Sequence, residues 1–130
     1  MKVIHTDKAP AAIGPYSQAI SHQGVLYCSG QIALSPTGED RTQAPVEEQT
    51  EQALHNLQAV LKAGGSSLNH VLKVGIFLAD MDDFQAVNTI YAKFFVNHKP
   101  ARACVAVRTL PKHALVEIEC VAAIITEEGT

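Results

Sequence analysis

Four residues near the C-terminus have side chains suited to chemistry: Arg102, Cys104, Glu117 and Glu119. Arg102 and Cys104 stand two positions apart in a strand-like segment, so both side chains face the same side of that strand. A hairpin between the last two strands, with its turn near Leu110-Pro111, would place Cys104 opposite Glu117. The same register places Arg102 opposite Glu119. We therefore expect an arginine and a glutamate close together on one face of a sheet.

This spacing has two interpretations. One is a cross-strand ion pair on a solvated sheet face, which is common and contributes little to stability. The other is a functional pair, in which Arg102 binds a substrate carboxylate and Glu117 orients a water molecule. Arginine suits carboxylate binding because its planar guanidinium offers two parallel hydrogen bonds. Spacing alone leaves both interpretations open.

Other polar residues of these segments carry weaker signals. A free cysteine is usually an inert packing residue, and no histidine stands beside Cys104 to act as its base. Packing is therefore the favoured interpretation of Cys104, and nucleophilic catalysis the less favoured one. On pattern alone, Ser29 is a strand residue and Tyr16 belongs to a loop.

Motifs for metals, phosphates and a nucleophilic serine are missing from the sequence. The histidines form no HxxxH or HExxH pair and there is no CxxC, so we expect no metal site. No GxGxxG, GxxxxGK or GxSxG motif occurs. The acidic residues Asp80, Asp82 and Asp83 could bind a cation, but a cluster at a helix N-terminus is the simpler interpretation.

Composition indicates one domain over residues 1–130 with an apolar core. Hydrophobic residues make up 47% of the chain and charged residues 18%, and this low charge favours burial against copies of the same chain. The net charge of −3 and the scattered lysines and arginines argue against nucleic-acid binding. Three cysteines without a signal sequence or a membrane-length apolar stretch predict a cytoplasmic protein with no membrane association.

Periodicity predicts the element order β-β-α-β-α-β-β. Strands are expected at 17–21, 25–31, 71–79, 102–107 and 115–125, and helices at 45–63 and after Asp80. Gly64-Gly65 is expected to stop the first helix, and Asp80 to cap the second. This order indicates an α+β fold in which both helices pack on one face of a mixed sheet. The opposite face is partly apolar and is expected to meet another subunit.

Several short motifs occur in the order and spacing of one known family. They are Ile13-Gly14-Pro15-Tyr16-Ser17-Gln18, Ser29-Gly30-Gln31-Ile32, Glu48-Gln49-Thr50, Pro100-Ala101-Arg102-Ala103-Cys104-Val105, Leu110-Pro111 and Val116-Glu117-Ile118-Glu119. At these residues the chain resembles the Rid family, also called the YjgF family, in its RidA branch. The resemblance runs from about residue 9 to residue 123.

The resemblance implies a chorismate-mutase-like α+β fold that assembles as a homotrimer, with active sites between subunits. It also implies an activity. Members hydrolyse reactive short-chain 2-imino and enamino acids, such as 2-iminobutanoate and 2-iminopropanoate, to 2-oxo acids and ammonia. No cofactor is implied, because a protonated imine is already electrophilic.

The resemblance also implies roles for residues of this chain. Arg102 would bind the substrate carboxylate and Glu117 would position the attacking water. Gly30 and Cys104 would contribute backbone groups. The full set of implied substrate-binding residues is Arg102, Tyr16, Ser29, Gly30, Cys104 and Asn88.

Two other functions stay open. Some relatives look like endoribonucleases or translation inhibitors, and a non-catalytic metabolite-binding or chaperone-like protein would have the same fold. The acidic balance weighs against RNA, and the presence of both Arg102 and Glu117 favours catalysis over binding alone. Gly75 and Ala106 depart from the residues commonest in close relatives, which leaves the substrate range open.

Overall fold

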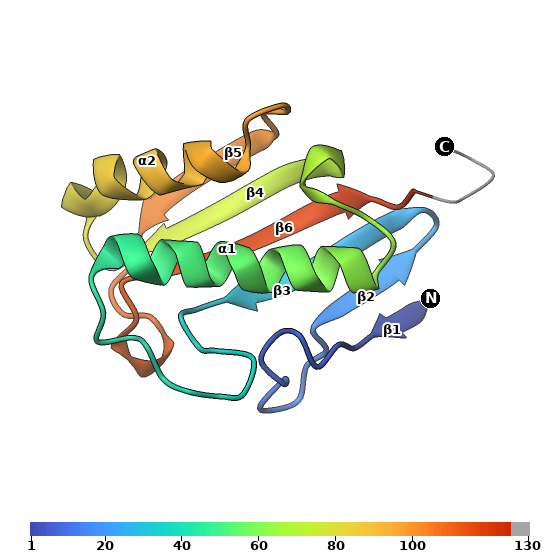
Figure 1. Ribbon diagram of the computed structural model, residues 1–130, viewed down its shortest axis with the longest axis horizontal. Helices are drawn as coiled ribbons and strands as arrows, with labels where there is room; N and C mark the ends of the chain where they lie inside the picture. Colours follow the sequence, from blue (N-terminus) through green and yellow to red (C-terminus); the bar gives the residue numbers. More distant parts are fainter. Residues whose placement is uncertain (126–130) are drawn as a thin grey trace.

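Two helices lie side by side on one face of a six-stranded sheet in the computed structural model, which describes residues 1–125 (Figure 1). The expected α+β fold is confirmed. One strand more than expected occurs at the N-terminus, because three residues are too few to show an alternating pattern. In chain order the elements are β1 (Lys2–Ile4), β2 (Ala19–His22), β3 (Val25–Gln31), α1 (Val46–Ala63), β4 (Val71–Leu78), α2 (Phe84–Phe94), β5 (Ala101–Ala106) and β6 (Val116–Ala123).

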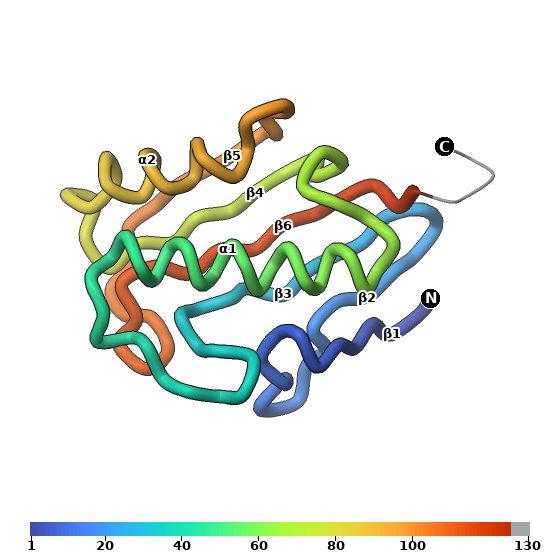
Figure 2. Tube along the Cα trace, in the orientation of Figure 1, coloured from blue at the N-terminus to red at the C-terminus, as the bar shows by residue number. Residues whose placement is uncertain are grey.

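The strand order across the sheet is β1-β2-β3-β6-β4-β5, so β4 separates the last two strands of the chain (Figure 2). β5 pairs with β4 in parallel, and β6 pairs antiparallel with β3 and β4. The expected hairpin between the last two strands is therefore wrong. The reason is the crossover through α2, which returns the chain to the end where β4 began and makes β5 parallel to β4.

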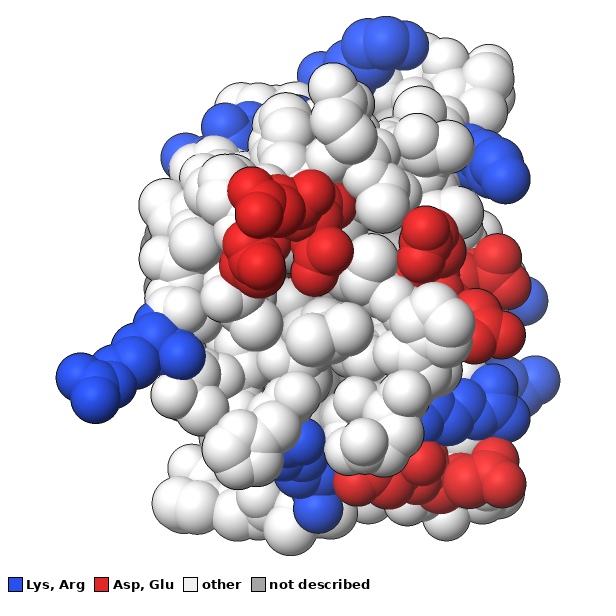
Figure 3. Space-filling view, turned by 90° about the vertical axis from the view of Figure 1, so that its left-hand side faces the viewer, with Lys and Arg blue, Asp and Glu red and all other residues white. Residues whose placement is uncertain are grey.

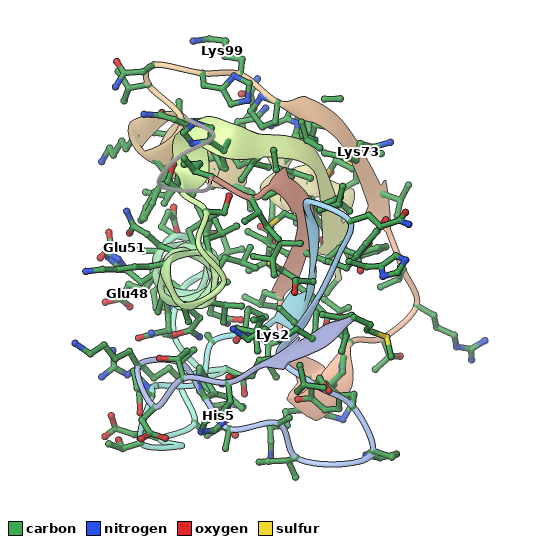
Figure 4. All side chains as sticks on the ribbon, turned by 90° about the vertical axis from the view of Figure 1, so that its right-hand side faces the viewer. Lys2, His5, Glu48, Glu51, Lys73 and Lys99 are labelled. Carbon is green, nitrogen blue, oxygen red and sulfur yellow. The ribbon has the colours of Figure 1, made fainter. Side chains whose placement is uncertain are left out.

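The two faces of the sheet differ in what covers them. Val116, Ile118, Cys120 and Ala122 of β6 are buried on the helix side, as expected from the alternating pattern. The residues between them face the other way, onto what we call the open face, which no described helix covers. Seen from the side, α1 lies end-on against one face only (Figure 4).

The local signals for turns and helix ends are confirmed with small shifts. Gln23 and Gly24 both have positive φ values, 51° and 79°, which suits the two-residue turn between β2 and β3. Pro45 is the residue before α1. The Asp80 carboxylate accepts a hydrogen bond from Asp82 N at 2.9 Å, and so caps a short 3-10 turn that leads into α2. Neither helix is long and apolar enough to cross a membrane.

One buried carboxamide connects the loop before α1 to the start of β6. Gln49 is fully buried, and its Nε2 donates to the carbonyl oxygens of Thr42 and Ala44 at 3.0 and 2.8 Å. Its Oε1 accepts from Leu115 N at 2.9 Å. A satisfied buried carboxamide of this kind holds two distant segments in one arrangement, because leaving any of these groups unpaired is costly.

Gly64, where α1 ends, provides a test of this packing. Its φ is −87°, so alanine is not excluded by backbone conformation, and alanine is the better helix former by about 1 kcal/mol. A Cβ at this position would, however, lie 2.5 Å from Cδ2 of the fully buried Leu26. We expect Gly64→Ala to destabilise the protein by about 1–3 kcal/mol in urea unfolding.

A Leu26→Val change should recover part of that loss, so that the double variant is more stable than the sum of the two single effects predicts. An unfolding midpoint for Gly64→Ala equal to that of the wild type would contradict this packing.

Candidate active site

Glu117 lies on the open face beside a bulge in β3. Pairing of β3 with β6 runs through Cys28 and Cys120 and resumes at Gln31 and Ile118, so β3 contains one extra residue there. A Cβ on Gly30 would lie 2.6 Å from Oε2 of Glu117. Glycine at position 30 therefore makes room for the glutamate side chain to lie across β3.

The segment that carries Tyr16 is held against the same bulge. Ser29 Oγ donates to the carbonyl oxygen of Ser17 at 2.6 Å, and Ser29 N donates to that of Gln18 at 3.0 Å. The buried Gln18 side chain accepts from Thr6 N at 2.7 Å and donates to the Pro10 carbonyl at 2.8 Å. These bonds fix the loop so that Tyr16, half exposed, lines a pocket with Glu117.

This glutamate pocket has a volume of about 540 Å³ and contains four of the residues expected in the site: Tyr16, Ser29, Gly30 and Glu117. Glu119 lines it as well. Burial, with a smaller effect from the neighbouring Glu119 charge, raises the pKa of Glu117 above its ordinary value of 4.5. A carboxyl group with a raised pKa exchanges protons more readily near neutral pH, which suits a general acid–base group.

Arg102 lies in a different place, beside α2. Its Nη1 donates to Oδ1 of Asn88 at 2.7 Å. Its Cζ lies 4.9 Å from the ring centre of Tyr91 and 5.7 Å from that of Phe84. The pocket at this position has a volume of about 560 Å³, and we call it the arginine pocket. It is lined by Asn88, Tyr91, Ala92, Phe95, Val96, Lys99, Pro100 and Arg102.

Arg102 and Glu117 therefore point to opposite faces of the sheet within one chain, and the expectation that they share a face is wrong. Arg102 pairs with Val74, which also pairs with the helix-facing Cys120. Glu117 pairs instead with Phe77. Because side chains alternate along β4, Phe77 and Glu117 face the side opposite to Val74 and Arg102. The cause is β4, which occupies the place next to β6 that the hairpin would have given to β5.

The cross-strand ion pair is wrong for the same reason. In the part of the chain that the structure describes, no carboxylate lies within ion-pair distance of Arg102. Cys104 is level with Ile76 and Ile118 and not with Glu117. Its pKa is raised by burial, with a smaller opposing effect from the Arg102 charge, so the thiol is protonated at neutral pH. Residues 1–125 contain no group of histidine, cysteine and acidic residues arranged to hold a metal.

Sequence analysis missed several residues beside Arg102 and Glu117. Tyr91, which lines the arginine pocket, and Phe84, whose ring lies beside Arg102, were given no role in the site, although their spacing from Asn88, four and three residues, places all three on one side of the helix. Gln18 had no signal beyond its place in a family motif. The contribution of Glu119 could have been inferred from its alternation with Glu117.

A profile described as Endoribonuclease L-PSP matches residues 6–124. The chain belongs to this family. The L-PSP family is also called the Rid or YjgF family, and it is the family whose motifs the sequence contains. The resemblance is therefore confirmed.

The relatives of the chain within the L-PSP family have several names. A mouse (Mus musculus) protein named 2-iminobutanoate/2-iminopropanoate deaminase is 49% identical over 121 residues, 93% of this chain and 90% of its own length. A RutC family protein of Pyrococcus horikoshii is 46% identical over 93% of this chain and 96% of its own. The crystal structure of Escherichia coli TdcF with bound serine matches with a TM-score of 0.91 and 37% identity, and covers 96% of this chain and all of that one.

The electrostatics of Glu117 predict a pH-dependent gain in stability when its charge is removed. Because its pKa is raised in the folded chain, its contribution to stability is complete below its unfolded pKa and is lost as pH rises through the folded value. Glu117→Gln, which is never charged, should therefore unfold at a higher urea concentration than the wild type at pH 7. The difference should disappear near pH 4.

Both proteins must be compared at one chain concentration. Glu51→Gln, at an exposed position that points away from the sheet (Figure 4), is the matched control and should change the midpoint little. A stability loss for Glu117→Gln at pH 7 would show that the carboxylate is held by favourable contacts instead.

Proposed function

We propose that this protein hydrolyses short-chain 2-imino acids to 2-oxo acids and ammonia, in a site formed by the arginine pocket of one chain and the glutamate pocket of another. The observation that carries this proposal is the separation of two complementary groups. Arg102 offers a guanidinium suited to a carboxylate, and Glu117 offers a partly buried carboxyl group with a raised pKa. Each lines its own pocket.

A substrate this small requires the second chain. In a 2-imino acid the carboxylate is bonded directly to the carbon that water attacks. The residue that binds the carboxylate and the residue that orients the water must therefore lie within a few ångströms of each other. Within one chain the side chains of Arg102 and Glu117 lie on opposite faces of the sheet. A second copy, docked against the open face, would bring its own arginine to the glutamate pocket.

The open face has the character of a contact surface. Val3, Tyr27 and Val105 all lie on it and are 62%, 50% and 47% exposed. Large apolar side chains exposed across this face, from one edge strand to the other, favour contact with another protein surface, because no described helix covers them. A homotrimer, as the family resemblance implies, would use this face and complete one site at each interface.

The chemistry balances without a cofactor. With the carboxylate on Arg102, the Glu117 carboxylate accepts a proton from water while the water oxygen bonds to C2 of the protonated imine. Glu117 then returns the proton to the nitrogen of the resulting carbinolamine. The C–N bond breaks, the proton of the hydroxyl group passes to the departing ammonia, and the 2-oxo acid and ammonium leave. Holding the two reactants together is the main contribution, since the iminium carbon is already electrophilic.

The relatives support the same class of substrate. The mouse protein is named for the deamination of 2-iminobutanoate and 2-iminopropanoate. The TdcF structure contains serine, an amino acid with the carboxylate that Arg102 would bind here. For this chain we infer a small carboxylate-bearing substrate. The open backbone of the edge strand at Cys104, and that of Gly30, would complete the contacts.

The surface charge does not favour RNA as the substrate. The chain has a net charge of −3. Acidic side chains gather on the face shown in Figure 3, where lysines and arginines are scattered. Asp80, Asp82 and Glu47 lie close enough to Asp83 to raise its pKa together with burial, which is the larger cause. A strongly salt-dependent RNA affinity would contradict this assignment.

A coupled assay tests the proposed activity. Threonine dehydratase and threonine supply the imine, semicarbazide competes for it, and the appearance of 2-oxobutanoate is followed. The wild-type protein should accelerate this step. Arg102→Ala should reduce turnover by at least one to two decades, because hydrogen bonds between charged groups contribute about 1.5–3 kcal/mol. Arg102→Lys should recover little, since an ammonium has no planar fork.

Glu117→Gln should separate binding from turnover. It should bind 2-oxobutanoate as the wild type does and lose activity, because an amide is a poor proton acceptor. Arg41→Ala is the matched control: Arg41 pairs with Glu39 on the surface, lines neither pocket, and should be dispensable. Normal 2-oxo acid binding by Arg102→Ala, or wild-type turnover by Glu117→Gln, would show that the roles are wrongly assigned.

A further inference from the structure

Three residues of α2 surround the Arg102 side chain. Phe84, Asn88 and Tyr91 follow one another at intervals of four and three, which places them on one side of the helix across two turns. Arg102, coming from β5, reaches the middle of this row. It bonds to Asn88 at 2.7 Å and lies within cation–π distance of the ring on either side. We call these three residues the guanidinium cradle.

The cradle restricts an otherwise mobile side chain. Arg102 is exposed and its side chain has many rotamers, so a free guanidinium would lose much entropy on binding a ligand. Two aromatic rings and one hydrogen bond define both the position and the plane of the group. Its only hydrogen bond with a residue in 1–125 uses Nη1. The Nε and Nη2 donors, which lie along the other edge, remain available as a parallel pair.

We propose that Phe84 and Tyr91 are positioning residues, which hold the Arg102 guanidinium so that its Nε–Nη2 edge meets the substrate carboxylate. This inference rests on the proposed function, because it assumes a carboxylate ligand. It adds two residues that act through Arg102. It also explains why this row of α2 has aromatic residues on both sides of a polar one.

The ring of Tyr91, and not its hydroxyl group, is the positioning element. The hydroxyl oxygen is buried and makes no hydrogen bond with any described residue. Burial raises the pKa of Tyr91 to about 12, so the phenol is uncharged and its ring face stays available to a cation. Phenylalanine at this position would keep the same ring face. Leucine would remove it while remaining apolar.

The test combines ligand affinity with a direct measurement on Arg102. The dissociation constant for 2-oxobutanoate is measured for Phe84→Leu, Tyr91→Leu and Tyr91→Phe. The NMR order parameter and chemical shift of the Arg102 Nε–H group are recorded without ligand. Phe84→Leu and Tyr91→Leu should weaken affinity by about three- to thirtyfold and mobilise the guanidinium. Tyr91→Phe should stay within twofold of the wild type in both measurements.

Phe94→Leu is the matched control. Phe94 is also a half-buried aromatic residue of α2, packed on the core, but its ring contacts His55 and not Arg102. A general loss of helix packing would affect Phe84→Leu and Phe94→Leu alike, and equal effects would overturn the inference. Phe84→Leu keeps the test decisive if Tyr91→Leu does not fold, since Phe84 is the less buried of the two.

The two readouts separate this inference from the proposed function. If Phe84→Leu mobilises the guanidinium but binds 2-oxobutanoate normally, the cradle does not serve carboxylate binding, and the function stands. If the wild-type guanidinium is rigid but the protein neither binds the 2-oxo acid nor accelerates imine hydrolysis, the proposed function fails, and with it the carboxylate as the ligand of the cradle.

Discussion

The position of β4 between β5 and β6 determines what one chain of this protein can do. Because side chains alternate between the faces of a sheet, the register across β4 directs Arg102 toward the helices and Glu117 toward the open face. Neither residue can be moved to the other face without shifting a whole strand by one position, which would expose the core side chains of that strand. The two groups are thus separated by the same alternation that builds the core.

Each half of the candidate site depends on specific features of the fold. On the open face, the bulge in β3 and the missing side chain at Gly30 create the space that Glu117 occupies. The buried Gln18 carboxamide then fixes the loop that carries Tyr16. On the helix side, the second helix supplies hydrogen-bonding and aromatic groups to Arg102. Both halves place a reactive group at the edge of its own pocket.

The sequence predicted the elements of the fold well and their spatial order less well. Hydrophobic periodicity located both helices, and turn residues located the β2–β3 hairpin, because these signals are local. The pairing of the last two strands was wrong, because a hairpin was inferred from their adjacency in the chain. The strand–helix–strand unit formed by β4, α2 and β5 contained the better signal, since such crossovers give parallel neighbours.

The same error accounts for what was missed in the site. With Arg102 assumed to face Glu117, the aromatic residues of α2 were given no role in the site. The family motifs identified candidate residues without showing their arrangement, because a motif records which residues occur and not which chain supplies them to a site. The bulge at Ser29 and Gly30 depends on pairing with a strand about 90 residues later in the chain, which no local pattern reveals.

Subunit complementation tests the central claim, that one chain supplies Arg102 and another supplies Glu117, most directly. Arg102→Ala and Glu117→Gln chains, each inactive alone, would be unfolded, mixed in equal amounts and refolded together. A site between chains predicts recovery of roughly a quarter of wild-type activity, because about one interface in four then combines an intact arginine with an intact glutamate. A mixture as inactive as its two components, in oligomers shown to contain both chains, would contradict the account.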